Sequence, residues 1–177
     1  MNTMDMIFSR KSIRSFNGEN ITDAQLQEIL KAAYAAPVGR AAYDSLAITV
    51  ITNKEYLSKW QSAVAEANGD PAMKPLYNAP TVILLSSKLA PSPACNINYS
   101  NAAIVVHNMA LAATELGVGA CHIWGAVMAM HANPRLIDEL NLPQGMVPCC
   151  ELALGQTDEK YELRQIPENR IHTEYYK

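Results

Sequence analysis

Residues 98–119, NYSNAAIVVHNMALAATELGVG, contain the longest helical pattern of the chain. Apolar residues lie on nearly every side of this pattern, and alanines recur along it: Ala102, Ala103, Ala110, Ala112 and Ala113. A helix that is apolar all round is typically buried, and its small side chains permit close approach of a neighbour. We therefore predict a buried central helix over 98–116, which the glycines at 117 and 119 bring to an end.

Capped helices and short apolar strands surround this helix in the sequence. Thr22 and Gln25 form a capping-box pattern for a helix over 22–36, and Asn53 can cap a second helix that ends near 68. Pro134, directly after an asparagine, begins a short helix over 134–140. Dense apolar or β-branched runs predict strands at 46–52, 81–85, 120–124 and 146–154. No repeat or linker interrupts this order, so we predict one α+β domain over 1–177.

The composition is that of a soluble globular protein and excludes several function classes. The chain has 177 residues, 18% of them charged, and a net charge of -3, which gives no general attraction to nucleic acid or acidic membranes. No stretch approaches the roughly 18 uninterrupted apolar residues of a membrane span, and the N-terminus lacks the pattern of a secretory signal. We expect a cytoplasmic protein without nucleic-acid or membrane partners.

The four cysteines do not suggest a disulfide framework in a chain of this size. Cys149 and Cys150 are adjacent, and we interpret them as small buried residues of a strand. A soft-metal site made of Cys121, His122 and the Cys149–Cys150 pair remains conceivable, although the spacing matches no zinc pattern. His107, within the central helix, is interpreted as a satisfied core or interface residue.

The segment Ser9-Arg-Lys-Ser-Ile-Arg14 is the most unusual local sequence. If the segment is extended, Arg10, Ser12 and Arg14 face one way while Ile13 faces the core, because side chains alternate along a strand. Two guanidiniums and a hydroxyl suit a phosphate group, which accepts forked and charge-assisted hydrogen bonds. From spacing alone, a solvated basic stretch before the first helix explains the segment slightly better than a phosphate site does.

The common nucleotide-binding loop motifs are not found in the sequence. Gly117-Val-Gly119 follows a helix rather than a strand and lacks the third glycine, so the Rossmann fingerprint fails. Neither paired carboxylates nor a Gly-x-Ser-x-Gly elbow stands out.

The order of four motifs resembles the nitroreductase family over essentially the whole chain. These motifs are RKSIRSF at 10–16, the helix ending in AAP at 35–37, NMALAATELGVG at 108–119, and LPQG with LALG at 142–155. The resemblance implies an α+β fold with a central, mostly antiparallel sheet flanked by helices. It also implies an intertwined homodimer with two flavin mononucleotide (FMN) sites at the interface.

The same resemblance assigns roles to residues. Four residues of the basic segment would hold the phosphate and ribityl end of FMN: Arg10, Lys11, Ser12 and Arg14. An arginine of the C-terminal tail would assist them, with Arg164 our first choice and Arg170 our second. The family segment beside the flavin ring falls on HIWGA at 122–126, where Gly125 would offer its N–H toward flavin N5.

Two departures from the family pattern concern the substrate side. After Pro37 the family reads Ser-x-x-Asn-x-Gln-Pro-Trp, whereas this chain reads VGRAAYDS at 38–45. We expect Arg40 to replace the lost donors to the flavin carbonyls and Tyr43 to form a pocket wall. Trp124 stands where many members carry glutamate, and both core packing and contact with the ring or substrate remain open for it.

The resulting hypothesis is an FMN-dependent oxidoreductase. Hydride would pass from NADH or NADPH through flavin N5 to a small acceptor such as a nitroaromatic, a quinone or free flavin, with no obligatory protein acid or base. The alternative is a flavin-binding carrier or redox sensor without nicotinamide turnover. A third hypothesis is a metal or thiol protein that uses Cys121, His122 and Cys149.

Overall fold

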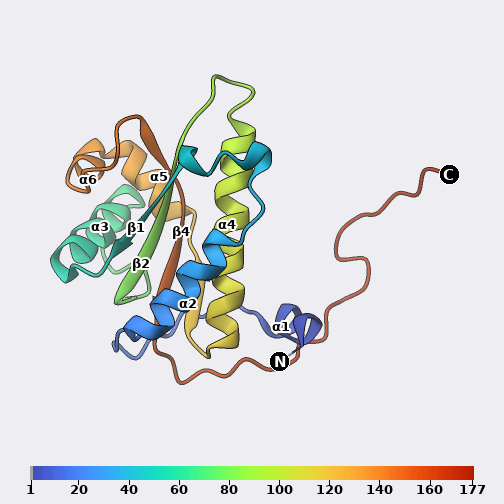
Figure 1. Ribbon diagram of the computed structural model, residues 1–177. Coiled ribbons are helices and arrows are strands. Elements are labelled where there is room, and N and C mark those ends of the chain that lie inside the picture. Colours follow the sequence, from blue (N-terminus) through green and yellow to red (C-terminus); the bar gives the residue numbers. More distant parts are fainter. Residues whose placement is uncertain (1) are drawn as a thin grey trace.

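Four antiparallel strands form the central sheet of the computed structural model, which describes residues 2–177 (Figure 1). Their bounds are β1 Leu46–Ile51, β2 Thr81–Lys88, β3 Gly119–His122 and β4 Met146–Gly155. The order across the sheet is β1-β2-β4-β3, so the two longest strands lie in the middle. The predicted α+β fold with a mostly antiparallel sheet is confirmed.

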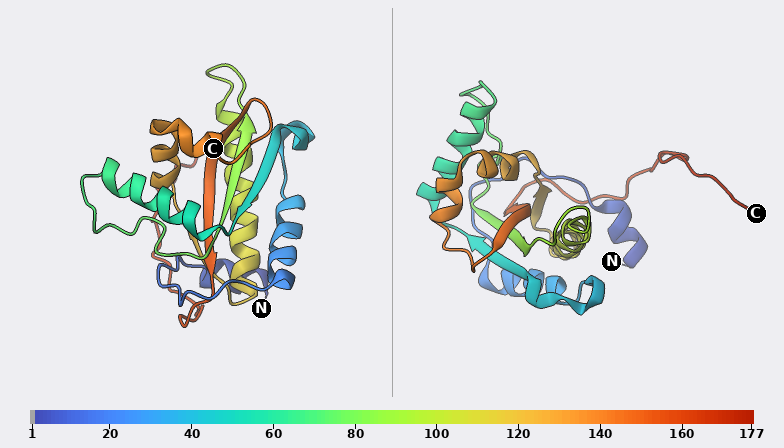
Figure 2. Two further views of the ribbon diagram at one scale, coloured as in Figure 1. Left: turned by 90° about the vertical axis from the view of Figure 1, so that its left-hand side faces the viewer. Right: turned by 90° about the horizontal axis from the view of Figure 1, so that it is seen from above.

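Helices cover both faces of this sheet (Figures 1 and 2). On one face lie α2 (Asp23–Tyr34) and α4 (Asn96–Glu115), and on the other lie α3 (Lys54–Ala67), α5 (Gly125–Ala132) and α6 (Pro134–Asp138). Alternation along β2 supplies both layers, because Ile83 and Leu85 pack with α2 and α4 while Val82 and Leu84 pack with the other helices.

The structure confirms the predicted N-termini of the two helices for which the sequence showed a side-chain cap. The Thr22 hydroxyl accepts from the Gln25 backbone N–H, and the Gln25 side chain accepts from the Thr22 N–H, which completes the capping box of α2. Asn53 Oδ1 accepts from the Tyr56 N–H at 2.9 Å and caps α3. These two helices begin where local hydrogen-bonding chemistry places them.

Two helices were not predicted. The seven-residue α1 (Thr3–Ser9) is too short for a clear periodic pattern, and α5, GAVMAMHA, is apolar without an amphipathic stripe. Ala126, Val127 and Met130 of α5 are fully buried, so tertiary packing rather than sequence pattern defines this helix. Because α5 begins at Gly125, β3 ends at His122 and not at 124 as predicted.

The prediction that the central helix is buried on all sides is wrong for a single chain. One face of α4 packs into the core through Val105, Val106 and Met109, but a second stripe is open to solvent. Ile97 and Ile104 of that stripe are 42% and 39% exposed. Apolar groups exposed along a helix stripe are typical of an interaction surface.

The C-terminal tail, residues 156–177, leaves the domain as an extended chain (Figure 1). Its outer part presents apolar side chains to solvent, since Ile171 and Tyr175 are each 81% exposed. Within residues 2–177, no helix is both long and apolar enough to cross a bilayer.

Candidate functional site

The basic segment is extended and pairs with the edge strand β3, since the Ile13 N–H donates to the Ala120 carbonyl at 2.9 Å. Ile13 is fully buried. Lys11 and Ser15, on the side of the segment away from Arg10, both bind Glu159; the Lys11 Nζ–Glu159 Oε2 distance is 2.7 Å. The structure therefore directs the Lys11 side chain into an ion pair instead of toward the other basic residues.

Arg10 lies in a cluster of groups that can carry positive charge. Burial and the positive charge of Arg164 lower the pKa of Arg10. The rings of His107 and His122 stack with centroids 5.9 Å apart and planes inclined by 26°. Partial burial, His107 and Arg10 lower the pKa of His122 to about 4, and partial burial and Arg10 lower the pKa of His107. We call Arg10, Arg164, His107 and His122 the basic cluster.

Arg164 reaches this cluster because hydrogen bonds anchor the tail at Tyr161 and at Arg164 itself. The Tyr161 hydroxyl donates to the Val118 carbonyl at 2.8 Å, and Arg164 Nε donates to the Phe8 carbonyl at 3.0 Å. Arg170 lies farther out on the exposed tail. Of the two arginines considered from the sequence, the structure places Arg164 beside Arg10.

Ser12 and Arg14 lie next to the basic cluster, on the same side of the segment as Arg10. Both residues act on the Cys121 thiol of β3, where they oppose the increase in pKa that burial causes. The Arg14 guanidinium also lies 5.7 Å from the centre of the Tyr77 ring, in a cation–π contact. Through these contacts, the basic segment runs from the basic cluster to the loop that precedes β2.

The end of β3 carries the other predicted contacts. Trp124 is 56% exposed and meets the Tyr99 ring edge-on, with centroids 6.4 Å apart. Core packing therefore does not explain this tryptophan. A cavity of about 200 Å³ lies beside it, between this turn and α4, with Tyr99, His122 and Cys150 in its wall.

Gly125, the first residue of α5, faces open space. A Cβ atom at this position would meet no atom within 4 Å. As the first residue of a helix it also has an N–H group without an intrahelical acceptor. The space on the Cβ side of Gly125 is therefore free for a ligand.

Arg40 does not join these residues within one chain. It lies in a short 3-10 turn, Gly39–Ala41, with a φ of 61°, and its side chain is exposed. The turn is held to the N-terminal part of α4, because the Gly39 N–H donates to Asn101 Oδ1 at 2.9 Å. In Figure 1 this turn and α1, from which the basic segment starts, lie at opposite ends of α4.

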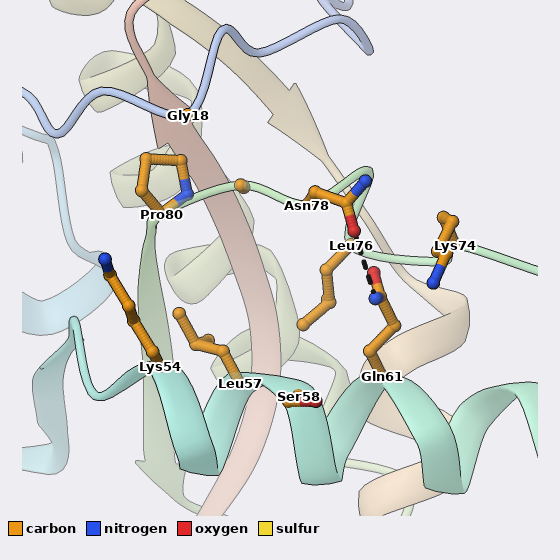
Figure 3. Close-up of a pocket in the computed structure, with 10 residues that line it drawn as sticks. Gly18, Lys54, Leu57, Ser58, Gln61, Lys74, Leu76, Asn78 and Pro80 are labelled. Atoms are coloured by element: carbon orange, nitrogen blue, oxygen red, sulfur yellow. Dashed lines mark hydrogen bonds between the residues drawn. The ribbon is translucent and has the colours of Figure 1, made fainter.

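A second cavity, of about 300 Å³, lies on the other side of the molecule, between α3 and the loop before β2 (Figure 3). Lys54, Lys74 and Gln61 are among its lining residues, and Gln61 Nε2 donates to Asn78 Oδ1 at 3.3 Å. None of the predicted cofactor residues lines this cavity. Its two ammonium groups point in different directions, so they do not converge on one ligand position (Figure 3).

The thiols show no activation. Burial raises the pKa of Cys149 to about 11 and that of Cys150 to about 12, and it also raises the pKa of Cys121. Across residues 2–177, no group of three or more His, Cys, Asp or Glu side chains is arranged to hold a metal ion. The described residues therefore give the metal or thiol hypothesis no support.

Sequence reasoning missed three members of this site. His107 was interpreted as a core or interface residue, His122 was given no role at the phosphate, and Tyr161 was not singled out. No local signal marks them, because they come from α4, β3 and the tail and meet only in the folded chain.

Comparison with known proteins places this geometry in a family. The family model described as "Nitroreductase family" matches residues 7–156. A protein of Archaeoglobus fulgidus, named as a candidate NADH dehydrogenase/NAD(P)H nitroreductase, is 27% identical over 176 residues, covering 97% of each chain. An FMN reductase (NADPH) of Bacillus subtilis is 26% identical over 165 residues, covering 87% of this chain and 65% of that protein.

The fold agrees with a solved structure. A nitroreductase of Desulfitobacterium hafniense, crystallised with bound FMN, superposes with a TM-score of 0.83 at 24% identity, covering 99% of this chain and 100% of that one. The family match spans the basic segment, the central helix and the closing strand, whereas the site residues Tyr161 and Arg164 of the tail lie beyond it. The chain belongs to the nitroreductase family.

Proposed function

We propose that this chain binds FMN and acts as an oxidoreductase that transfers hydride from NADH or NADPH to a small acceptor. Nitroaromatics, quinones and free flavin are the acceptor classes. The basic cluster is the observation that carries this proposal. Arg164 is the neighbour whose positive charge lowers the pKa of Arg10, and no carboxylate of residues 2–177 is among the groups that act on Arg10. An anionic ligand would balance these positive charges.

The phosphate of FMN fits this unbalanced cluster. A guanidinium presents several N–H donors in a planar fork that matches phosphate oxygens, and bonds between charged partners are stronger than neutral ones. In the proposed complex Arg10 and Arg164 bind the phosphate, and Ser12 contributes its hydroxyl. The Lys11 side chain stays paired with Glu159 and does not take part.

The flavin ring fits the open space at the end of β3. The Gly125 N–H would donate to the ring, and it lies at the positive N-terminus of α5, which favours negative charge. Trp124 and Tyr99 form one wall of the adjoining cavity, in which the nicotinamide and the acceptor bind in turn. When bound, FMN accepts hydride at N5 and passes it on; the chain holds the reactants over the ring and supplies most of the effect by proximity.

A second copy of the chain completes the proposed site. The exposed stripe of α4 and the extended apolar tail are surfaces that a partner would bury. The separation of Arg40 from the basic cluster also agrees with a site made by two chains, in which Arg40 approaches the flavin bound to the partner. Light scattering of the purified protein should therefore give a dimer mass.

An absorbance spectrum followed by anaerobic titration tests the function. The purified protein should be yellow or take up added FMN, and NADH or NADPH should bleach the oxidised flavin band. A protein that neither contains nor binds FMN would contradict the proposal. If the holoprotein stays oxidised with both nicotinamides, the chain is a flavin carrier or sensor rather than a reductase.

Substitution of Gly125 tests where the ring binds. Gly125→Val should leave the apoprotein folded, because a side chain meets no atom within 4 Å there and φ lies outside the left-handed region. The valine side chain would enter the space assigned to the flavin ring. We therefore expect FMN affinity to fall at least about tenfold, or about 1.4 kcal/mol.

The matched control is Ala132→Val at the exposed far end of the same helix. Binding is followed by quenching of flavin fluorescence, and folding by circular dichroism. Equal FMN affinities for the two variants would place the ring elsewhere.

A further inference from the structure

We propose, on the basis of the FMN site above, that His107 and His122 are part of the phosphate site and take up a proton when the phosphate binds. The cofactor would then be held by two permanent charges, from Arg10 and Arg164, and by one charge that appears only on binding. This assigns the histidine pair a binding role that is separate from the flavin chemistry.

The geometry brings the pair to the phosphate end of the site. His107 comes from the open stripe of α4 and His122 is the last residue of β3, and their rings stack 5.9 Å apart. Arg10 acts electrostatically on both rings, and Arg164 acts on Arg10. An anion bound between the two arginines therefore lies close to the histidine pair.

The groups that face the pair determine its charge in the empty protein. Arg10 of the basic segment acts on both rings, and His107 acts on His122. Glu151 of β4 lines the same cavity as His122, and burial raises the pKa of its carboxyl well above the usual value, which favours the neutral form. Positive neighbours and partial burial keep both imidazoles neutral near pH 7, and the pKa of His122 is about 4. Two neutral rings can stack closely, whereas two protonated rings would repel each other.

A bound phosphate reverses this balance. Its charge of about −1.5 to −2 favours the protonated form of a nearby imidazole and raises the histidine pKa toward neutrality. In the pH range between the pKa of the empty site and that of the occupied site, binding takes up a proton. Within that range, the uptake of one proton increases the affinity for FMN by up to about tenfold for each unit by which the pH falls.

The test compares apoprotein variants over pH. We would measure the Kd of FMN by fluorescence quenching between pH 5.5 and 8.0 for the wild type, His107→Gln and His122→Gln. The FMN phosphate itself titrates near pH 6, and taking the ratio of variant to wild-type Kd cancels this contribution. His131→Gln is the matched control, because His131 lies on α5 and binds the Pro148 carbonyl, a contact that glutamine can preserve.

We expect the ratio of variant to wild-type Kd for FMN to rise as the pH falls for His107→Gln or His122→Gln. For His131→Gln this ratio should stay near one. With riboflavin, which lacks the phosphate, the ratio should not change with pH. Calorimetry of the wild type at pH 6.5 in two buffers of different ionisation enthalpy should show more proton uptake than in the His122→Gln variant. If the Kd ratio of both histidine variants does not change with pH, or changes equally with riboflavin, the proposed role of the histidines is wrong. The proposed FMN site would not be affected by that result. Absence of FMN binding by the wild type at every pH would instead remove the proposed function, and this inference with it.

Discussion

Replacing Arg10 by alanine is expected to lower FMN affinity by about 100-fold or more. Arg10 connects the cluster, because Arg164 acts on it and it acts on both His107 and His122. A charge-assisted hydrogen bond to phosphate contributes about 1.5–3 kcal/mol. The loss of a forked pair of such bonds therefore corresponds to about 3 kcal/mol or more. The Kd is measured by fluorescence quenching of FMN.

The structure provides a matched control one residue away. Lys11→Ala removes a neighbouring positive charge whose Nζ is already bound to Glu159 at 2.7 Å, so FMN affinity should change by no more than a few-fold. The Arg10→Ala apoprotein should not be destabilised by the loss of charge, since the variant removes a repulsion from Arg164. Equal losses for the two variants would show that net charge, and not the geometry of the cluster, holds the cofactor.

Replacing Glu151 by leucine is expected to stabilise the protein at pH 7, by up to about 3 kcal/mol, and to change how its stability depends on pH. Glu151 of β4 is 1% exposed, and neither carboxyl oxygen has a hydrogen-bond partner among residues 2–177. Burial raises the pKa of this carboxyl well above its usual 4.5. Alternation along β4 places it on the same face as Ala153, and it lines the cavity beside Trp124.

The pH dependence follows from this increase in pKa. Above about pH 4.5 the carboxyl loses its proton in the unfolded chain but keeps it in the folded one. The free energy of unfolding therefore decreases as the pH rises, by about 1.4 kcal/mol per unit, until the pH reaches the folded-state pKa. Glu151→Leu should remove this slope. If the loss continues over the whole range from pH 4.5 to 7, it sums to about 3 kcal/mol, which is the upper bound of the expected stabilisation.

Urea unfolding of the apoprotein between pH 5 and 8, at one protein concentration, checks this result. Glu151→Gln serves as the second variant, because its neutral amide also removes the slope but leaves a buried polar group. It should therefore be less stable than the leucine variant. A wild-type stability that does not change over this range would mean that the carboxyl has a partner in the assembled protein.

Local chemistry explains how much of the fold could be predicted. The caps at Thr22 and Asn53 act over three residues, so the sequence shows them directly, and the structure confirms both. The four strands were predicted from short apolar runs, with errors of a few residues at the ends of β2 and β3. α5 was missed because a short helix that is apolar all round has no pattern to distinguish it from a buried strand or loop.

The candidate site was predicted in part, for the same reason. The alternation of side chains in the extended segment 10–14 correctly separated Arg10 from Ile13, since this depends only on neighbouring residues. Assigning Lys11 to the phosphate came from the family resemblance, and the structure places its side chain on Glu159, a residue of the tail. Such a pairing across the chain leaves no trace in the local sequence.

The sequence by itself therefore determined the order of elements, their caps, the α+β class and the location of a basic segment. Only the tertiary structure decided which charges meet. Arg10, His107, His122 and Arg164 come from four separate parts of the chain, and the electrostatic energy between them depends on distance in space rather than in sequence. The exposure of Trp124 and the burial of Glu151 have the same origin, because packing between layers sets both.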